Sequence, residues 1–574
     1  MALLYEAARK RIKKLLLEIY PEEHLTEDYL NKLYGVIEEN LGDVTCSLAK
    51  WDERDTVLIT YGNSITREEE KPLHTLHNFL KEYLYDEFQC LHILPFFPYS
   101  SDDGFSVIDY YQVDRRLGDW DDIRQINQDY DLMVDLVINH VSSKSQWFRN
   151  YLEGNSPGKD FFIEANPQTD VSQVTRPRNT PLLTEFQTSE GKKLLWTTFS
   201  EDQVDLDFSN PWVLYEMLRV LFFYINKGAR VIRLDAIAYL WKESGTTCIH
   251  LPQTHKIVKF IRELAELINP DIIILTQTNV PDRENRSYFG KNFDEAHMVY
   301  QSPLPPLMLY TLHTGNSEKF TAWVKSIPET EGEATYFNFT ASHDGIGVRP
   351  AEGIIPAEEI SEMADKMKDF GGYIKTKTNQ DGSESPCEIN ITWFDALKGT
   401  SKGEDDLQKE RFLCSQTIMM SLRGIPGFYI HSLIATKNDH ELVKKTRSYK
   451  IINLKTRYYY QLTERLTDGN HFTSEIFTEL KRLIRIRISQ PAFHPDAGQE
   501  VLDLGNAFFG IKRSYQSNDK LWSISNITSQ KQAFTLSREI FPNQSLTDLT
   551  ENKTYKVNQA LTLNPYQTLW IKPD

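Results

Sequence analysis

Polar side chains that could do chemistry follow several short apolar segments of this sequence. Some are carboxylates, which can attack an electrophilic carbon or exchange protons. Others are histidines and an arginine, which can hold hydroxyl or anionic groups. Together these residue types suit chemistry on a polar, hydroxyl-rich substrate. The set consists of Asp102, Asp103, Asn139, His140, Arg233, Asp235, Gln277, His343 and Asp344.

The segment RLDA, residues 233–236, has a chemical logic of its own. Side chains alternate along a strand, so Arg233 and Asp235 are expected on the same face. A cation two residues away favours the ionised form of Asp235, which suits a carboxylate nucleophile. A structural salt bridge inside a barrel is the alternative. The sequences INH (138–140) and SHDG (342–345), at the ends of other segments, favour the catalytic interpretation.

The elements that would position these residues are eight short apolar, β-branched segments separated in several places by helical patterns. Residues 211–228 and 255–270 show the clearest helical spacing. Apolar strands alternating with helices indicate a parallel sheet, and eight such units predict an α/β fold, a (β/α)₈ TIM barrel. Active sites of such barrels lie at the C-terminal ends of the strands. The eight segments are 56–62, 90–97, 130–140, 228–236, 271–278, 296–301, 335–344 and 424–431.

The rest of the chain is organised around this barrel. We expect a helical N-terminal extension over residues 1–50, a barrel over 51–495 and a small C-terminal β-sandwich over 496–574. Two strand-to-strand intervals are too long for one helix and a loop. We therefore expect inserted loop subdomains over the barrel mouth at 141–207 and 345–405.

Composition excludes several classes of partner. The 574 residues carry a formal net charge of -17, which argues against a general affinity for nucleic acid or anionic membrane. No segment approaches the roughly 18 apolar residues of a membrane span. The N-terminal sequence has helical spacing but lacks a continuous apolar core and a cleavage site, so it does not resemble a signal peptide. We expect a helix that packs on the protein's own surface rather than an amphipathic membrane helix.

The five cysteines are few, scattered and odd in number. They show no paired metal-ligand spacing, and this usage favours a reducing compartment, so we expect a cytoplasmic protein. We also expect neither a metal ion nor an organic cofactor. The cysteines are Cys46, Cys90, Cys248, Cys387 and Cys414.

Four motifs occur in the order of the signature regions of the α-amylase superfamily of glycoside hydrolases, and the chain resembles that family. They are DLVINH, VIRLDA, ILTQT and ASHDG. HILPFFPYSSDDGFSVIDY, LTQTNVP, DEAHMVYQSPLPPL and SHDGIGVRP are similar to its sucrose phosphorylase branch. VTRPRNTPLLTEFQ, TTFSEDQVDLDF, GTTCIHLPQTH and the helical extension most resemble the glucosylglycerate phosphorylases within that branch.

The resemblance implies a retaining mechanism with a small-molecule α-glucoside as substrate. Asp235 would attack the anomeric carbon, and a carboxylic acid at position 277 would protonate the leaving acceptor. Asp344 would stabilise the transition state, and phosphate would release α-glucose 1-phosphate. Arg178 matches a position that contacts phosphate or an anionic acceptor; a solvent-facing loop charge is the alternative. The implied glucosyl-binding residues are Asp102, His140, Arg233, Tyr239 and His343.

Three positions depart from the family pattern. Gln277 stands where the family has Glu, and an amide cannot donate or accept a proton at working pH. Cys387 replaces an aromatic hydroxyl in a loop at the mouth. Leu454 replaces an arginine that helps to hold the glucosyl unit, and losing such a charge-assisted hydrogen bond costs roughly 1.5–3 kcal/mol. Arg457, three residues further on, is not expected to replace that arginine.

Three functions remain open at this stage. The first is reversible phosphorolysis of an α-glucoside, glucosylglycerate being the favoured substrate, with activity reduced by Gln277. The second is phosphorolysis of sucrose 6'-phosphate. The third is a non-catalytic protein that binds a glucoside or a sugar phosphate. The basic sequence RPR (176–178) disfavours a simple hydrolase, and the sequence does not determine the oligomeric state.

Overall fold

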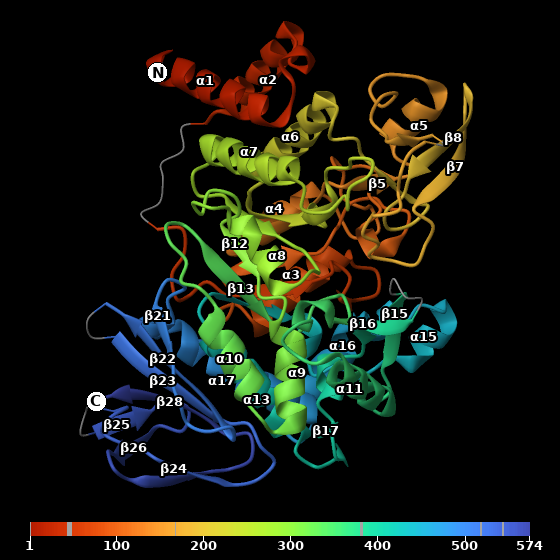
Figure 1. Cartoon of the computed structure of the whole chain (residues 1–574). Helices are drawn as coiled ribbons and strands as arrows, with labels where there is room; N and C mark the ends of the chain where they lie inside the picture. Colours follow the sequence, from red (N-terminus) through yellow and green to blue (C-terminus); the bar gives the residue numbers. More distant parts are fainter. Residues whose placement is uncertain (1, 43–48, 167, 379–382, 517–518, 542–544) are drawn as a thin grey trace.

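In the computed structural model of this chain, eight parallel strands close into a central barrel (Figure 1). The structure describes all residues except 1, 43–48, 167, 379–382, 517–518 and 542–544. Around the barrel the strands follow the order β1-β19-β13-β12-β11-β10-β4-β3. Their bounds are β1 Val57–Thr60, β3 Cys90–Ile93, β4 Asp131–Val137, β10 Ala229–Asp235, β11 Ile273–Thr276, β12 Met298–Tyr300, β13 Thr335–Phe339 and β19 Ile425–Tyr429.

Each of the eight predicted apolar segments contains one barrel strand, which confirms the predicted (β/α)₈ fold. Every residue of β1 and β11 is buried, because the barrel interior covers one face and the helices cover the other. Helix α6 begins at Pro211, and the Asn210 side chain accepts a hydrogen bond from the backbone N–H of Trp212. The helices of this layer are α3 Pro72–Tyr83, α4 Trp120–Asp129, α6 Pro211–Asn226, α7 Pro252–Ile268, α8 Asp282–Arg286, α9 Leu304–Thr314, α10 Glu318–Ser326, α13 Gln408–Ser421 and α17 Phe472–Ile488.

Two helices, α1 (Ala2–Ile19) and α2 (Glu27–Asn40), form the N-terminal extension and lie against α7 and α6. Leu16 is fully buried, and Lys256 Nζ donates a 2.6 Å hydrogen bond to the carbonyl of Glu18. The extension therefore packs on the protein's own surface, as the sequence indicates. None of the helices in the described part of the chain is long and apolar enough to cross a bilayer.

Two insertions cover the C-terminal ends of the barrel strands. A hydrogen bond of 3.3 Å from Asn179 Nδ2 to the carbonyl of Thr376 joins them. The first insertion contains β5 His140–Ser142, α5 Gln146–Glu153, β6 Glu164–Ala165, β7 Leu183–Thr188, β8 Gly191–Trp196 and β9 Gln203–Asp205. The second contains β14 Ile346–Gly347, α11 Ala357–Asp369, β15 Tyr373–Thr378, β16 Glu384–Asn390, α12 Trp393–Ala396, β17 Gly399–Thr400 and β18 Gly403–Glu404.

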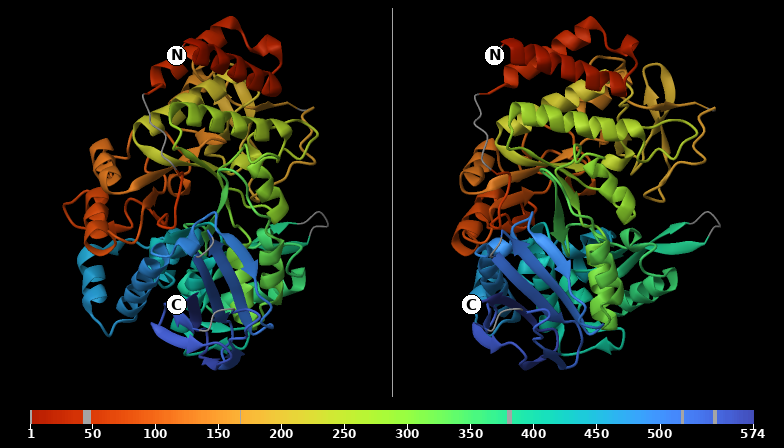
Figure 2. Two further views of the ribbon diagram at one scale, coloured as in Figure 1. Left: turned by 90° about the vertical axis from the view of Figure 1, so that its left-hand side faces the viewer. Right: turned by 60° about the vertical axis from the view of Figure 1, so that its left-hand side comes forward.

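After β19 the chain forms short helices before the C-terminal sheets. They are α14 Ile430–Leu433, α15 His440–Thr446, η6 Lys450–Asn453 and α16 Tyr459–Thr467. A six-stranded sheet, β21-β22-β23-β28-β25-β26, then faces the two-stranded sheet β24-β27 across a separate apolar core. Figure 2 shows these sheets at the opposite end of the molecule from the N-terminal helices. The strands are β21 Gly498–Val501, β22 Phe508–Tyr515, β23 Asp519–Asn526, β24 Gln532–Thr535, β25 Ser545–Asp548, β26 Lys553–Lys556, β27 Ala560–Leu563 and β28 Thr568–Pro573.

The six-stranded sheet is joined to the barrel layer through Trp570. This side chain is fully buried, stands 5.0 Å from the Phe493 ring and donates a 2.9 Å hydrogen bond from Nε1 to Ser421 Oγ in α13. It therefore combines apolar burial with a satisfied polar atom between two parts of the chain.

We expect Trp570→Ala to lower the free energy of unfolding by about 3–5 kcal/mol, because it leaves a large cavity at this joint. Trp570→Phe, which keeps most of the apolar volume, should cost only about 1 kcal/mol for the lost hydrogen bond. Urea unfolding followed by circular dichroism measures both. Equal losses for the two variants would show that packing does not dominate at this position.

Candidate active site

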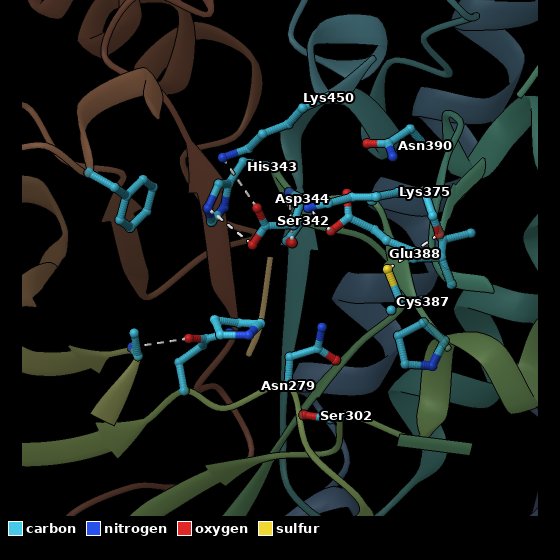
Figure 3. A pocket seen from close by; sticks show the side chains of 18 of the residues that line it. Asn279, Ser302, Ser342, His343, Asp344, Lys375, Cys387, Glu388, Asn390 and Lys450 are labelled. Atoms are coloured by element: carbon cyan, nitrogen blue, oxygen red, sulfur yellow. Dashed lines mark hydrogen bonds and ion pairs between the residues drawn. The ribbon is translucent and has the colours of Figure 1, made fainter. Parts of the chain in front are cut away.

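A cavity of about 510 Å³ opens at the C-terminal ends of the barrel strands (Figure 3). Nine of the predicted site residues line it and come from separate strand ends and from the first insertion, whereas Asp103 and Asn139 do not line it. Their convergence follows from the parallel arrangement, which brings the carboxyl ends of all eight strands to one end of the barrel. The nine are Asp102, His140, Arg178, Arg233, Asp235, Tyr239, Gln277, His343 and Asp344.

Arg233 is the buried cation of this cavity, and two carboxylates share it. Its Nη1 donates a 2.9 Å hydrogen bond to Asp235 Oδ1, and the same atom bonds to Asp135. The second contact follows from the sheet, since β10 and β4 place Arg233 and Asp135 opposite each other. His92 lies 2.7 Å from the other oxygen of Asp135, and Tyr300 Oη accepts from Arg233 Nε at 3.1 Å.

The shared cation changes the expected electrostatics of Asp235. Burial raises the pKa of its carboxyl to about 6, and the negative charges of Asp135 and Asp344 act in the same direction. Arg233 lowers that pKa but does not outweigh burial. Arg233 therefore favours the ionised form, as the sequence predicts, although burial keeps the pKa above its ordinary value. Asp235 remains mostly a carboxylate at pH 7.

Gln277 lies in the same cavity as Asp235 and contacts its strand. The backbone N–H of Ala236, the residue after Asp235, donates a 3.3 Å hydrogen bond to Gln277 Oε1. Ala236 has a positive φ of 50°, so the chain turns sharply at this point. The side-chain amide is therefore held near the proposed nucleophile, but it offers no proton that can be exchanged at neutral pH.

A second cation, Lys450, bridges two further carboxylates. Its Nζ lies 3.3 Å from Asp102 Oδ1 and 3.4 Å from Asp344 Oδ1. Burial alone would raise the pKa of both carboxyls, but Lys450, with His343 beside Asp344 and Arg178 beside Asp102, lowers them. Sequence reasoning missed Lys450, because it stands in a short loop helix without strand or helix periodicity.

The positive charge of Lys450 is relevant to the loss of the family's arginine at position 454, where this chain has Leu454. Leu454 follows η6 and does not line the cavity, whereas Lys450 at the start of η6 does. Arg457 donates to Thr436 Oγ1 at 3.0 Å and also lies outside the cavity lining, as expected. The segment therefore delivers a positive charge to the cavity four residues earlier than the position of the missing arginine.

Two histidines and a phenylalanine form one wall of the cavity. The His343 ring stacks on Phe105 with centroids 4.9 Å apart and planes 9° apart. His140 Nε2 lies 3.0 Å from the carbonyl of Phe105 and 3.1 Å from Gln203 Nε2. Burial lowers the pKa of both histidines to about 4, so both are neutral at pH 7 and suited to hydrogen bonds with hydroxyl groups.

Arg178 belongs to the cavity, not to the solvent-facing loop surface. Its Nη2 donates a 2.9 Å hydrogen bond to Asp102 Oδ2, and its guanidinium carbon lies 5.4 Å from the centroid of the Phe199 ring. Tyr239 stands edge-on to the same ring, with centroids 5.5 Å apart. The first insertion thus brings Arg178 and Phe199 over the barrel mouth, where they meet Tyr239 from the segment after β10.

The second insertion contributes charged residues that the sequence analysis did not single out. Lys375 in β15 and Glu388 in β16 line the cavity, with Lys375 Nζ 3.9 Å from Glu388 Oε2, and Arg349 lines it as well. Cys387 is buried, and its thiol contacts the carbonyl of Lys375 at 3.3 Å. Of these residues, only Arg349 lies in a motif identified from the sequence, SHDGIGVRP, and Glu388 directly follows Cys387.

One group of potential metal ligands occurs in the described residues, away from this cavity. Atoms of Glu266, His297 and Glu333 lie within 4.8 Å of one another. Lys50 Nζ stands 3.6 Å from Glu266 and 3.3 Å from Glu333, and Arg262 donates to Glu266 at 3.0 Å. Lysine and arginine therefore already neutralise these carboxylates, and the group is better described as an ion-pair cluster.

Known proteins similar to this chain include glucoside phosphorylases. Residues 81–344 match the family described as alpha amylase, catalytic domain. Glucosylglycerate phosphorylase of Spirochaeta thermophila is 45% identical over 533 residues, which cover 91% of this chain and 90% of that protein. The protein of the same name from Escherichia coli is 41% identical over 98% of this chain and 100% of its own length.

The solved structure of sucrose 6F-phosphate phosphorylase from Thermoanaerobacter thermosaccharolyticum has the same fold. It matches with a TM-score of 0.73 and 24% sequence identity, covering 91% of this chain and 100% of that one.

The raised pKa of Asp235 predicts a pH profile. Attack requires the carboxylate, so kcat/KM for α-glucosyl fluoride should fall about tenfold per pH unit below about pH 6, as Asp235 becomes protonated. Fluoride release between pH 4 and 8 measures it. The pKa of Asp344 is lowered, so its protonation should not cause a further decrease in kcat/KM within this pH range. An acid limb centred near pH 4 would contradict the environment described for Asp235.

Because Lys450 bridges two carboxylates, we expect kcat/KM to fall when its positive charge is removed. Lys450→Met should lower kcat/KM about 10–150-fold, equivalent to the roughly 1.5–3 kcal/mol of a charge-assisted hydrogen bond, whereas Lys450→Arg should retain most activity. Lys455→Met is the matched control, since Lys455 pairs with Asp439 at 2.8 Å outside the cavity lining. Similar losses for Lys450→Met and Lys455→Met would remove Lys450 from the site.

Proposed function

We propose a function on one premise: the chain belongs to the α-amylase family and, within it, to the sucrose phosphorylase-like branch of glucoside phosphorylases. On that premise it transfers a glucosyl unit reversibly between phosphate and a small acceptor. An α-glucoside and phosphate give α-glucose 1-phosphate and the free acceptor. The observation that carries the proposal is the Asp235 carboxylate, which lines the cavity and accepts a hydrogen bond from Arg233.

In the proposed mechanism, Asp235 attacks the anomeric carbon and forms a β-glucosyl-enzyme as the bond to the acceptor oxygen breaks and the acceptor leaves and takes up a proton. Phosphate then attacks the same carbon from the opposite face as the bond to Asp235 breaks. Asp344 accepts hydrogen bonds from sugar hydroxyls that strengthen as positive charge develops at that carbon. Asp102, His140 and His343 hold the glucosyl unit, with Arg233 and Lys450 balancing the carboxylate charges. We assign Arg178 to the phosphate or to an anionic acceptor.

Glycerate is the proposed acceptor. Relatives named glucosylglycerate phosphorylase are 41–45% identical to this chain, whereas one named sucrose 6(F)-phosphate phosphorylase is 28% identical. Arg178, Arg349 and Lys375 line the cavity and suit an acceptor that carries a carboxylate. The same residues also suit a sugar phosphate, so sucrose 6'-phosphate is the second acceptor to test.

Compartment and partners are part of the proposal. The four described cysteines are unpaired and buried, whereas Cys46 lies outside the described residues. This agrees with a reducing compartment, and we place the protein in the cytoplasm with small molecules, an α-glucoside and phosphate, as its partners.

Gln277 favours a second candidate function, a non-catalytic protein that binds a glucoside or a sugar phosphate. General acid–base catalysis contributes typically about 10²–10⁴-fold, so a phosphorylase without its acid would be slow with an alkoxide leaving group. Phosphate is already a good leaving group and, as an anion, a nucleophile that needs no base. The steps that involve phosphate therefore depend less on position 277 than those that involve the acceptor hydroxyl.

Gln277→Glu separates the two candidates. If the chain is a slowed phosphorylase, this variant should raise phosphorolysis of glucosylglycerate by about 10²–10⁴-fold. The unaltered chain should react with α-glucosyl fluoride, and azide should accelerate turnover because it needs no base. Release of α-glucose 1-phosphate and of fluoride measures these steps.

Asp235→Asn is the control, because it should abolish both reactions. If Gln277→Glu gives no gain and azide has no effect, the non-catalytic function is the better description. Turnover of sucrose 6'-phosphate exceeding that of glucosylglycerate would replace the proposed acceptor.

A further inference from the structure

The deglucosylation step with a neutral acceptor needs a base that Gln277 cannot supply. A base must lie within hydrogen-bond reach of the acceptor hydroxyl, or one water away from it. Among the described residues, four side-chain carboxylates line the cavity: Asp102, Asp235, Asp344 and Glu388. Asp235 carries the glucosyl unit in this step, which leaves three.

Two of these three carboxylates, Asp102 and Asp344, already contact other side chains. Asp102 accepts from Arg178 at 2.9 Å and from Gln203 at 3.1 Å, and both it and Asp344 lie within 3.4 Å of Lys450 Nζ. These cations lower the pKa of both carboxyls, so neither is a good proton acceptor at neutral pH.

The neutral cavity groups are poorer choices. His140 contacts Asn139 through Nδ1 at 3.2 Å and the carbonyl of Phe105 through Nε2 at 3.0 Å. His343 is stacked on Phe105 with Nε2 3.4 Å from Asp344. Burial of both histidines weakens them as bases at neutral pH.

Glu388 differs in its contacts and in its position. Its nearest ion-pair partner, Lys375 Nζ, lies at 3.9 Å, beyond hydrogen-bond distance. Figure 3 shows both side chains extending from β15 and β16 into the cavity toward Asp344. The position that a Cβ on Gly345 would occupy lies 2.8 Å from Glu388 Cγ, so Glu388 packs directly beside the residue that follows Asp344.

The same strand reaches the loop that carries Gln277. In the β14–β16 ladder, Gly347 stands opposite Glu388. A Cβ on Gly347 would lie 2.7 Å from Asn279 Oδ1, so Asn279 packs against Gly347. Asn279 is two residues after Gln277. Glu388 therefore stands on the side of the cavity formed by Asp344 and the Gln277 loop.

We propose that Glu388 is the acid–base catalyst of this chain in the step that involves the acceptor, an inference that rests on the phosphorylase function. In the synthetic direction, the bond from Asp235 to the anomeric carbon forms as the bond to phosphate breaks, and phosphate leaves with the electron pair. The acceptor oxygen then attacks that carbon, the bond to Asp235 breaks, and the hydroxyl proton passes to the Glu388 carboxylate. Glu388 returns this proton to phosphate through solvent, and phosphorolysis runs in reverse.

Lys375 completes this arrangement. The Lys375 ammonium lies 3.9 Å from Glu388 Oε2 and leaves that carboxylate free of a direct hydrogen bond to the cation. Together with Arg349, it also suits the carboxylate of glycerate, so one wall would orient the acceptor and take its proton.

The test is a pair of substitutions combined in all four ways: Glu388→Gln alone, Gln277→Glu alone, both, and neither. Each protein is given α-glucose 1-phosphate and glycerate, and phosphate release is followed. With Gln277 present, Glu388→Gln should lower kcat by about 10²–10⁴-fold, the typical contribution of general acid–base catalysis. With Glu at position 277, the same substitution should lower kcat less than about threefold, because the carboxylate at position 277 then supplies the base.

Two controls separate catalysis from structure. Glu384→Gln, on the same strand, removes a carboxylate that accepts from Thr376 Oγ1 at 2.9 Å outside the cavity lining, and it should leave turnover unchanged. Azide should react with the glucosyl-enzyme formed from α-glucosyl fluoride equally well in the unaltered chain and in the Glu388→Gln variant, since azide needs no base.

Equal losses from Glu388→Gln in both backgrounds would overturn the proposal, because that result describes acceptor binding alone. No loss in either background, or a loss of the azide reaction, would also overturn it. If only proteins with Gln277→Glu turn over glycerate, Glu388 is not the base although the phosphorylase function stands. If no protein of the four turns over glycerate or sucrose 6'-phosphate, the proposed function itself fails.

Discussion

The site depends on one constraint: a single buried guanidinium, Arg233, must balance two carboxylates at the end of the barrel. The parallel pairing of β10 with β4 sets Asp135 opposite Arg233, and strand alternation puts Asp235 on the same face two residues later. Asp135 and Asp235 both form an ion pair with the Arg233 guanidinium. Burying a charge without a partner is costly, so the shared arrangement fixes the position of Asp235 while leaving its carboxyl less acidic than a fully paired one.

The same arrangement recurs at the opposite wall of the cavity, where Lys450 is shared between Asp102 and Asp344. There the cation comes from the segment after the last barrel strand, and the two acids come from loops after β3 and β13. One ammonium thus ties three distant segments into one surface. This ion pair adds to the hydrogen bonds that join these loops to other segments, such as that from Asn453 to the carbonyl of Asp344.

The amide at Gln277 changes which steps such a cavity can perform easily. In the proposed mechanism, forming the glucosyl-enzyme from a donor with a good leaving group uses Asp235 and the positions of Asp102 and Asp344. Transfer to a neutral hydroxyl also needs a proton acceptor, and the barrel strands no longer supply it at position 277. The second insertion carries Glu388 and Lys375 into the same space. An inserted hairpin can therefore supply a function that the barrel lacks without altering the barrel core.

The sequence alone predicted the barrel and its eight strands and, with the family resemblance, nine residues that meet in the cavity, although the predicted Asp103 and Asn139 lie outside its lining. It could do so because buried parallel strands have a strong apolar pattern and because their carboxyl ends must converge. Only the tertiary structure decided that Arg233 is shared with Asp135, since this depends on the register between two strands. It also decided the places of Lys450 and Glu388, which lie in a loop helix and an inserted hairpin. No periodicity marks such residues, and contacts between segments far apart in the chain bring them to the cavity.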